Sequence, residues 1–344
     1  MAARVRGVRL SGGAAESATD AVALLSEYGR ECAGAVVAVP VGTEPTANAE
    51  YVSIDDAALE SRIAEVPLHP LGTDPRREIR MSLAGVQPKL LLARFDGSWY
   101  EAVGGAATTH ILKPTTAWAS SAENEALVLG LARAAGLTHV ESWVETIGGT
   151  SVLVTQRYDR RIAGRAVTRL HQEDMCQALG IRPAEKYALG RPADRMARLV
   201  REFADSPRQE LLTLFRQLAF RAIVGDEDGH GKNFSLLSDD GRISMAPVYD
   251  SLCTLAYDQL PGKMATPVGD RELLSQIDRD ALLAEARAMR IPRPEARAAL
   301  DNLASNLTAA LAVAPVTDQV TERVVAIVGE RVERLRTGRE LGRP

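Results

Sequence analysis

The strongest chemical signal in the sequence is a polar loop, GDEDGHGKNF, in which Asp228 is followed five residues later by Asn233. A carboxylate can accept the proton of an attacking hydroxyl, and an amide oxygen suits Mg²⁺. A short loop can aim the base at the acceptor oxygen while its far end returns to a metal. Gly229 and Gly231 would allow the tight backbone path that this needs. The alternative interpretation is an ordinary Gly/Asp turn on the surface.

Residues outside this loop complete the set that phosphoryl transfer requires. Asp250 follows the next short apolar stretch, where a second Mg²⁺ ligand would stand. Lys113 ends the segment THILKP, and a predicted helix with Glu123 and Glu125 follows it. Protein kinases have the same order of strand lysine, helix glutamate, catalytic aspartate, asparagine and metal-binding aspartate. Lys113 alone fits an edge strand equally well, so it is the complete order that indicates a kinase using ATP and Mg²⁺.

Two further segments are candidates for nucleotide contacts. The stretch SLAGVQPK, residues 82–89, stands where a kinase has its nucleotide-covering loop, although its single glycine also fits an ordinary β-turn. The segment from Gln156 to Tyr158 is predicted to be the hinge whose backbone meets adenine. Nearby arginines either bind phosphate or an acidic partner, or form a solvated basic loop. They are Arg157, Arg160, Arg161, Arg165 and Arg169.

The elements that must position these residues begin with a β-rich region. Hairpins are expected around Asp96–Gly97 and around Gly148–Gly149, with a third strand at THILKP. Between the third strand and the second hairpin, an amphipathic pattern predicts a helix that stops at Gly136. Further upstream, in the segment EYVSIDDAALESRIAEV, Asp55 is expected to be the N-cap of a helix. This order predicts a small sheet with one crossing helix.

From about residue 165 onward, helical patterns dominate. The long apolar segment LLTLFRQLAFRAIVG predicts a helix that leads directly into the polar loop. A short strand is expected on each side of the stretch SDDGR, and later helices are expected to break at Pro292, Pro294 and Pro315.

Composition narrows the class of protein. The 344 residues suggest about two domains. The 41 basic and 45 acidic side chains give a net charge of −4, which argues against a protein that coats nucleic acid by itself. Three cysteines far apart in the sequence do not suggest a disulfide framework or a zinc site. We see no signal-peptide pattern and no run of about 20 apolar residues, so we expect a cytoplasmic protein.

Taken together, these segments resemble the HipA-type serine/threonine kinases, the toxins of bacterial type II toxin–antitoxin systems. The matching stretches lie in the family's order over roughly residues 75–270. They are SLAGVQPK, THILKP, ENE, VTQRYDRR, RLHQEDMCQALG, GDEDGHGKNFSLL and PVYDSL. The resemblance implies an α+β, two-lobed, atypical protein-kinase-like fold with a small β-rich N-lobe and a helical C-lobe. It places a shortened N-terminal subdomain at 1–74, the N-lobe at 75–160 and the C-lobe at 161–344.

The resemblance also implies roles for individual residues. Asp228 would be the catalytic base, and Asn233 and Asp250 would bind Mg²⁺. Ser82 matches a serine that such kinases autophosphorylate, where the added charge of roughly −1.5 to −2 would repel ATP. The residues that would contact ATP are Ala84, Gly85, Val86, Gln87, Pro88, Lys89, Lys113, Gln156, Arg157, Tyr158, His230 and Lys232.

The implied partners follow from the same resemblance. The substrate would be a protein of the aminoacyl-tRNA synthetase class, whose phosphorylation would halt translation. A HipB-like antitoxin would make any contact with DNA. Because the N-terminal piece is shorter than is usual in the family, a separate small barrel subunit is also expected, as in HipT-like tripartite systems. Two alternatives stay open: a sugar or antibiotic kinase of related fold, and a non-catalytic subunit of a repressor complex.

Overall fold

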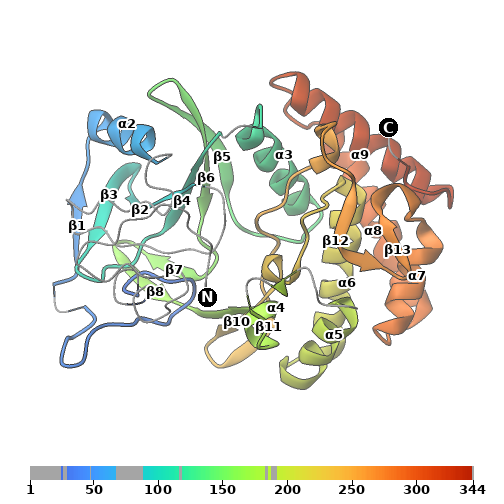
Figure 1. The fold of residues 1–344 in the computed structure, drawn as a ribbon, viewed down its shortest axis with the longest axis horizontal. Helices are drawn as coiled ribbons and strands as arrows, with labels where there is room; N and C mark the ends of the chain where they lie inside the picture. Colours follow the sequence, from blue (N-terminus) through green and yellow to red (C-terminus); the bar gives the residue numbers. More distant parts are fainter. Residues whose placement is uncertain are drawn as a thin grey trace. The chain divides into compact units, whose positions relative to one another are not determined.

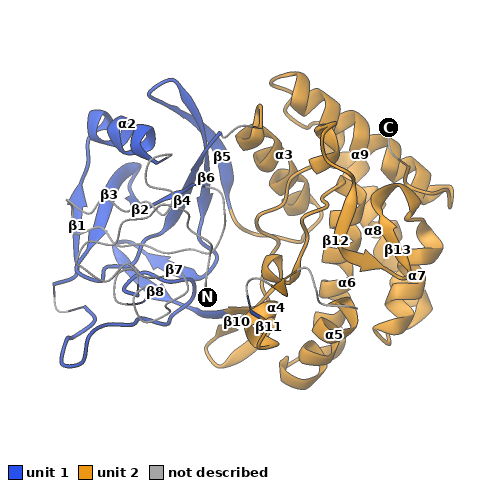
Figure 2. Ribbon diagram, in the orientation of Figure 1, with its two compact units in different colours: residues 1–117, 141–172, 182–184 blue, residues 118–140, 173–181, 185–344 orange. Residues whose placement is uncertain are grey.

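The structure, a computed structural model, describes residue 25 and residues 29–46, 48–66, 88–115, 118–182, 185–186 and 192–342. The chain forms two compact units, coloured separately in Figure 2. Unit 1 consists of residues 1–117, 141–172 and 182–184, and unit 2 consists of residues 118–140, 173–181 and 185–344. Each unit has its own buried apolar core.

The described residues of unit 1 form a six-stranded antiparallel sheet in the order β1-β3-β2-β4-β6-β5. Both predicted hairpins are confirmed. Asp96 and Gly97 have φ values of 51° and 81°, and Gly148 and Gly149 have 55° and 77°. Two consecutive positive φ values match the right-handed twist of the flanking strands. The strands are β1 (Glu50–Ser53), β2 (Leu90–Phe95), β3 (Ser98–Val103), β4 (His110–Pro114), β5 (Ser142–Ile147) and β6 (Thr150–Gln156).

One helix and one further hairpin complete the described part of unit 1. Helix α2 (Asp56–Glu65) begins as predicted, with the Asp55 side chain accepting a hydrogen bond from the Ala58 N–H at 2.8 Å. Its buried Leu59 and Ile63 pack into the same core as β2. Strands β7 (Arg160–Ala163) and β8 (Ala166–Arg169) pair as an antiparallel hairpin. The sequence did not predict this hairpin.

Unit 2 is built mainly from helices around α6 (Pro207–Val224), whose buried residues belong to its core. Figure 1 shows α6 beside α8 and α9, which it contacts. The predicted long apolar helix is therefore confirmed, and it ends at Gly225, whose φ of 77° is left-handed. The other helices are α3 (Ser121–Ala134), α4 (Met175–Ala178), α5 (Pro192–Phe203), α7 (Arg279–Ala288), α8 (Arg293–Leu311) and α9 (Gln319–Arg336).

Short strands and single helical turns lie between these helices. A three-stranded sheet has the order β11-β10-β9, and β12 pairs with β13. The strands are β9 (His171–Asp174), β10 (Ser235–Asp239), β11 (Arg242–Met245), β12 (Lys263–Val268) and β13 (Arg271–Leu273). The 3₁₀ turns are η2 (Gly231–Asn233), η3 (Thr254–Ala256) and η4 (Leu274–Gln276). The sequence predicted strands β10 and β11, although not their pairing, and it did not predict β12 and β13.

One predicted helix break is wrong. Pro294 lies in the first turn of α8, directly after Pro292 and Arg293. A proline there loses no helical hydrogen bond, because the first N–H groups of a helix have no partner within it. Across the described ranges, we find no helix both long and apolar enough to cross a bilayer.

Candidate active site

The polar loop of unit 2 starts where α6 ends and leads through η2 into β10. The Asp228 side chain is 55% exposed, whereas Asn233 is buried. The N–H of Asp228 donates to Asp226 Oδ1 at 3.1 Å, and the N–H of Asn233 donates to the His230 carbonyl at 2.8 Å. The loop therefore presents one carboxylate to solvent from a hydrogen-bonded backbone.

Asn233 and Asp250, the two predicted Mg²⁺ ligands, contact each other. Asn233 Nδ2 donates to Asp250 Oδ2 at 3.2 Å and to the Asp250 carbonyl at 3.3 Å. Asn233 Oδ1 is buried and has no hydrogen-bond partner in the structure. Asp250 has a φ of 51°, a conformation that residues other than glycine adopt rarely and that often marks a functional site.

This pair fits the metal that the kinase interpretation requires. It places a buried amide, whose Oδ1 has no hydrogen-bond partner, against an exposed carboxylate, and Mg²⁺ prefers hard oxygen ligands of these kinds. Across the described ranges, no three His, Cys, Asp or Glu side chains gather into a metal-binding cluster. Mg²⁺ bound with a nucleotide usually keeps phosphate oxygens and water in its coordination shell beside one or two protein ligands.

His230 and Lys232 occupy different positions within the loop. His230 Nε2 lies 2.8 Å from Lys186 Nζ and 4.0 Å from Asp228 Oδ1. Burial lowers the pKa of His230; Asp228 opposes this shift and Lys186 adds to it. A neutral ring whose Nε2 accepts from Lys186 agrees with that direction. Lys232 Nζ lies 2.5 Å from Asp174 Oδ2, so this predicted phosphate neighbour is ion-paired in the structure.

Sequence reasoning missed the buried Arg221, on the last turn of α6. Its guanidinium forms an ion pair with Asp226, and it donates to the carbonyls of Asn233 at 3.2 Å, Tyr249 at 2.8 Å and Asp250 at 3.2 Å. The available signal was an arginine in an otherwise apolar helix segment, because a charged side chain is seldom buried unless it is paired.

Strand β12 and turn η3 also hold the loop backbone. The N–H of Ala265 donates to the Glu227 carbonyl at 2.8 Å, and Thr266 Oγ1 donates to the Gly229 carbonyl at 2.6 Å. The N–H of Glu227 donates in turn to Thr254 Oγ1 at 3.0 Å. These contacts come from segments that the sequence did not connect with the loop.

The structure gives another reason for a glycine at position 229 than the tight backbone path that we expected. The φ of Gly229 is not left-handed, so no unusual backbone conformation requires a glycine here. A Cβ at this position would instead lie 2.8 Å from Arg221 Cδ, closer than real Cβ contacts come. Gly229 thus leaves room for the arginine.

Unit 1 carries the other predicted nucleotide residues, and the structure describes only some of them. Lys113 lies in β4, buried and opposite Leu153 of β6. Pro88 and Lys89 directly precede β2, and Lys89 is also buried. Five predicted residues lie outside the described residues: Ser82, Ala84, Gly85, Val86 and Gln87.

The predicted hinge lies at the end of β6. The N–H of Gln156 donates to the Glu141 carbonyl at 3.0 Å, and the N–H of Arg157 donates to the Thr109 carbonyl at 2.9 Å. The Tyr158 hydroxyl donates to Gln172 Oε1 at 2.7 Å. Arg157 itself is buried, and its side chain points into the ion network described next.

A buried ion network in unit 1 gathers three arginines of the predicted basic cluster. Glu31 accepts from Arg157 at 2.8 Å, from Arg160 at 2.9 Å and from Arg169 at 2.7 Å. Asp159 accepts a second bond from Arg157 at 2.7 Å. For these three arginines, the predicted solvated loop and the predicted free phosphate site are both wrong, because their side chains are paired with Glu31. We call this set of five side chains the arginine network.

The charges in the arginine network shift one another's ionisation. Burial would raise the pKa of Glu31, but Arg157, Arg160 and Arg169 together hold it below its ordinary value. Burial also opposes ionisation of Asp159, yet Arg157 lowers its pKa to about 2. Burial and the neighbouring Arg157 lower the pKa of Arg160 to about 10. Glu31, Asp159 and Arg160 are therefore charged at neutral pH.

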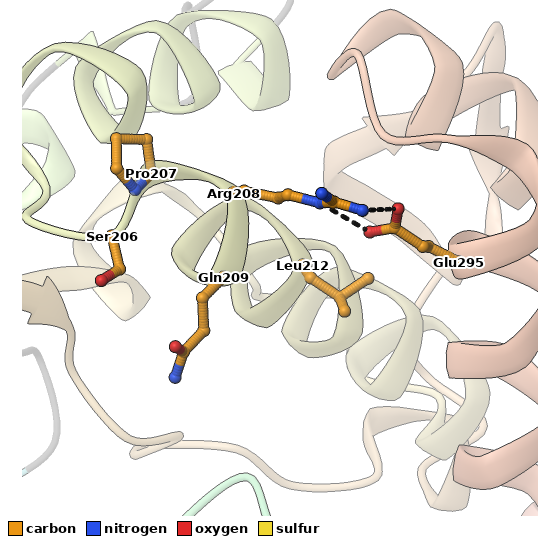
Figure 3. A pocket seen from close by; sticks show the side chains of 6 residues that line it. All are labelled: Ser206, Pro207, Arg208, Gln209, Leu212 and Glu295. Atoms are coloured by element: carbon orange, nitrogen blue, oxygen red, sulfur yellow. Dashed lines mark hydrogen bonds and ion pairs between the residues drawn. The ribbon is translucent and has the colours of Figure 1, made fainter.

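A surface pocket of unit 2 lies away from the loop. Figure 3 shows its lining, which includes the ion pair between Arg208 and Glu295. It sits at the first turn of α6, whereas the loop follows the last turn. Eighteen residues at 1.5 Å each put these two ends about 27 Å apart, so the pocket is not part of the candidate site.

Comparison with known proteins identifies the family. The HipA-like C-terminal domain family matches residues 81–311. A protein of Sinorhizobium fredii named "Putative kinase Y4mE" is 38% identical over 299 residues, which cover 84% of this chain and 71% of that protein. The serine/threonine-protein kinase toxin HipA of Shewanella oneidensis is 27% identical over 263 residues, covering 72% of this chain and 60% of the toxin. The chain belongs to the HipA-like kinase family.

A solved structure confirms the fold. The Shewanella oneidensis HipA, in a complex with HipB and its operator DNA, matches with a TM-score of 0.75 at 22% identity. The match covers 94% of this chain and 78% of that one. The predicted α+β, HipA-type fold is therefore correct.

Proposed function

We propose that this protein is an ATP- and Mg²⁺-dependent serine/threonine protein kinase and the toxin of a bacterial type II toxin–antitoxin system. The observation that carries the proposal is the geometry of the unit 2 loop. An exposed Asp228 stands in the same loop as Asn233, whose amide Nδ2 donates to the Asp250 carboxylate and whose buried Oδ1 has no hydrogen-bond partner. Membership of a kinase family supports a role for these residues in phosphoryl transfer.

The proposed reaction is an in-line transfer of the γ-phosphoryl group of ATP. A substrate hydroxyl oxygen bonds to the γ-phosphorus, the bond from that phosphorus to the β–γ bridging oxygen breaks, and ADP leaves. Asp228 orients the hydroxyl and accepts its proton. Asn233 and Asp250 would hold Mg²⁺, which when bound neutralises charge on the phosphate oxygens.

The nucleotide contacts are proposed on the family's pattern. Lys113 would meet the phosphates, with the segment 84–89 covering them and His230 and Lys232 beside them. The Gln156–Tyr158 segment would meet adenine through its main chain, because the Arg157 side chain is occupied in the arginine network. Autophosphorylation at Ser82 would then switch the kinase off.

The proposed partners follow those of the relatives. A toxin that phosphorylates an aminoacyl-tRNA synthetase would stop translation, and a HipB-like antitoxin would neutralise it and contact DNA on its behalf. The Shewanella oneidensis HipA complex with HipB and operator DNA supports the antitoxin. A separate small barrel subunit remains part of the proposal. We place the system in the cytoplasm, where translation and operator DNA are found.

The proposal is tested by following the γ-phosphate of labelled ATP. The purified chain, incubated with a cell extract of proteins and metabolites, is expected to label a synthetase and itself at Ser82, as mapped by peptide mass spectrometry. The Asp228→Asn variant is expected to label neither. Label found only on sugars or antibiotics would instead establish a small-molecule kinase. No transfer to anything would favour a non-catalytic subunit.

A further inference from the structure

Arg221 joins the parts of the candidate site that come from different segments of unit 2. Asn233 lies in η2, while Tyr249 and Asp250 follow β11. One guanidinium reaches the main-chain carbonyls of all three, at 2.8–3.2 Å. A guanidinium suits this task because its five N–H donors have a fixed planar arrangement.

Asp226 extends the same contact to the proposed base. It pairs with Arg221 through Oδ2, which also accepts from the Ser251 hydroxyl at 2.8 Å. Its Oδ1 accepts from the N–H of Asp228 at 3.1 Å. The Arg221–Asp226 pair thus touches the backbone of Asp228 as well as that of the two proposed metal ligands.

Arg221 also holds the backbone around Asp250. The left-handed backbone of Asp250 is less favourable for an aspartate than for a glycine, and contacts around the residue help to hold it. Arg221 binds the carbonyl of Asp250 and that of the preceding Tyr249. The ring of Phe234, with its centroid 5.2 Å from the guanidinium carbon, closes one side of Arg221.

We infer that Arg221, held by Asp226, is the positioning residue that sets the spacing of Asn233 and Asp250 for the metal. The inference rests on the proposed function, since it assumes that these two residues bind Mg²⁺ with ATP. A lysine at position 221 keeps the charge but has a single nitrogen, which cannot reach three carbonyls and a carboxylate together. The two ligands would then lose their common anchor.

The chain offers a matched control in Arg331 of α9. This arginine is also fully buried, and its guanidinium donates to the carbonyls of Ala222, Ile223 and Leu274 at 2.6–3.2 Å. None of these carbonyls belongs to the loop or to the Asp250 segment. Arg331→Lys therefore makes the same chemical change in the same core without touching the proposed metal ligands.

The test measures Mn²⁺ binding to the full chain with ATP, by the electron paramagnetic resonance signal of free Mn²⁺. Outer-shell partners of metal ligands typically change metal affinity about 10–100-fold. We expect Arg221→Lys to weaken Mn²⁺ binding by at least about tenfold and Arg331→Lys to leave it within about twofold, both relative to wild type. Comparable losses of thermal stability in the two variants would show that stability alone does not explain the difference.

Two results would overturn the inference: Mn²⁺ affinity of Arg221→Lys within twofold of wild type, or an equal loss in Arg331→Lys. If Arg221→Lys does not fold, Asp226→Asn replaces it under the same criteria. The proposed function fails separately. Wild-type protein that binds Mn²⁺ and ATP but transfers no phosphate would refute the kinase and leave the positioning role intact.

Discussion

The two units bury arginines against different partners. In unit 1, Arg157, Arg160 and Arg169 share the carboxylates of Glu31 and Asp159. In unit 2, Arg221 has one carboxylate, Asp226, and three main-chain carbonyls. Three positive and two negative side chains leave the arginine network with a charge of +1, whereas the Arg221–Asp226 pair is neutral.

The partners also differ in how far apart they lie in the sequence. Glu31 is 126 residues from Arg157, while the groups around Arg221 all lie within 29 residues of it. The arginine network therefore fixes the fold of unit 1 by joining distant segments. The Arg221 cluster fixes the shape of one loop. We expect damage to the first to appear mainly as lost stability, and damage to the second mainly as lost activity.

The largest expected loss of stability comes from Glu31→Gln. The change keeps the shape of the side chain but leaves three arginines, of which Arg157 and Arg160 are buried, with one carboxylate. Breaking a buried ion pair by removing one partner costs about 3–5 kcal/mol, because the remaining charge stays uncompensated. Urea unfolding of the full chain, compared with wild type, measures the loss.

The matched control for that prediction is Glu295→Gln. Glu295 pairs with Arg208, which is 80% exposed, at the surface of unit 2. Exposed pairs contribute little to stability, so we expect no measurable change. Equal effects of the two substitutions would contradict the stabilising role of the arginine network.

A second prediction concerns the pH dependence of the free energy of unfolding, to which His110 contributes. Burial and the nearby Arg94 lower the pKa of His110, in β4, from 6.5 to about 4. Between these values the unfolded chain binds more protons than the folded chain, so stability falls as the pH drops from 6.5 toward 4. The loss amounts to about 3 kcal/mol. Asp159, whose pKa Arg157 lowers to about 2, stays ionised over this window, and the pKa of Glu31 is shifted in the same direction.

The measurement is the free energy of unfolding at several pH values for wild type and for His110→Asn. The variant is expected to lose the part of the slope that His110 contributes. His230, whose pKa is also lowered, contributes in the same direction in both proteins and so cancels in the comparison. Identical slopes would show that His110 does not titrate as we expect.

A third, smaller effect is expected at Gly229, beside Arg221. A methyl group there would press on the arginine side chain at 2.8 Å. Overpacking of this kind costs about 1–3 kcal/mol, and here it would also displace the residue that binds the loop carbonyls. We therefore expect Gly229→Ala to lower the phosphoryl-transfer rate more than its stability loss explains at temperatures where it remains folded.

Gly130→Ala is the control for Gly229→Ala. Gly130 lies within α3 and would have no atom within 4 Å of an added Cβ. Alanine in a helix interior is more stable than glycine by roughly 0.5–1 kcal/mol, so this change should stabilise the protein and leave the rate unchanged. A normal rate in Gly229→Ala would contradict the claim that the space beside Arg221 matters.

Local patterns predicted much of the fold. The hairpins at Asp96–Gly97 and Gly148–Gly149, helix α3 and helix α6 follow from turn residues and periodicity near in sequence. The Pro294 break was wrong because a proline in the first helical turn is tolerated. The hairpin β7–β8 was missed, since its arginines read as a basic loop until their partner Glu31 is known.

The candidate site likewise contains residues that a local sequence pattern indicates and residues that only the tertiary structure connects with it. Asp228, Asn233 and Asp250 were recognisable because their types and spacing match a known chemistry. The roles of Arg221, Thr266 and the other groups that hold the loop depend on tertiary contacts that no local pattern contains.

The central claim is that the unit 2 loop carries out phosphoryl transfer through Asp228. The most direct test measures the transfer rate of Asp228→Asn at saturating ATP and Mg²⁺, with thermal unfolding recorded on the same samples. A positioned base contributes about 10²–10⁴-fold to the rate, so we predict a loss in that range. The unfolding midpoint should stay unchanged, because the Asp228 side chain is 55% exposed. A folded variant that transfers phosphate at close to the wild-type rate would contradict the account.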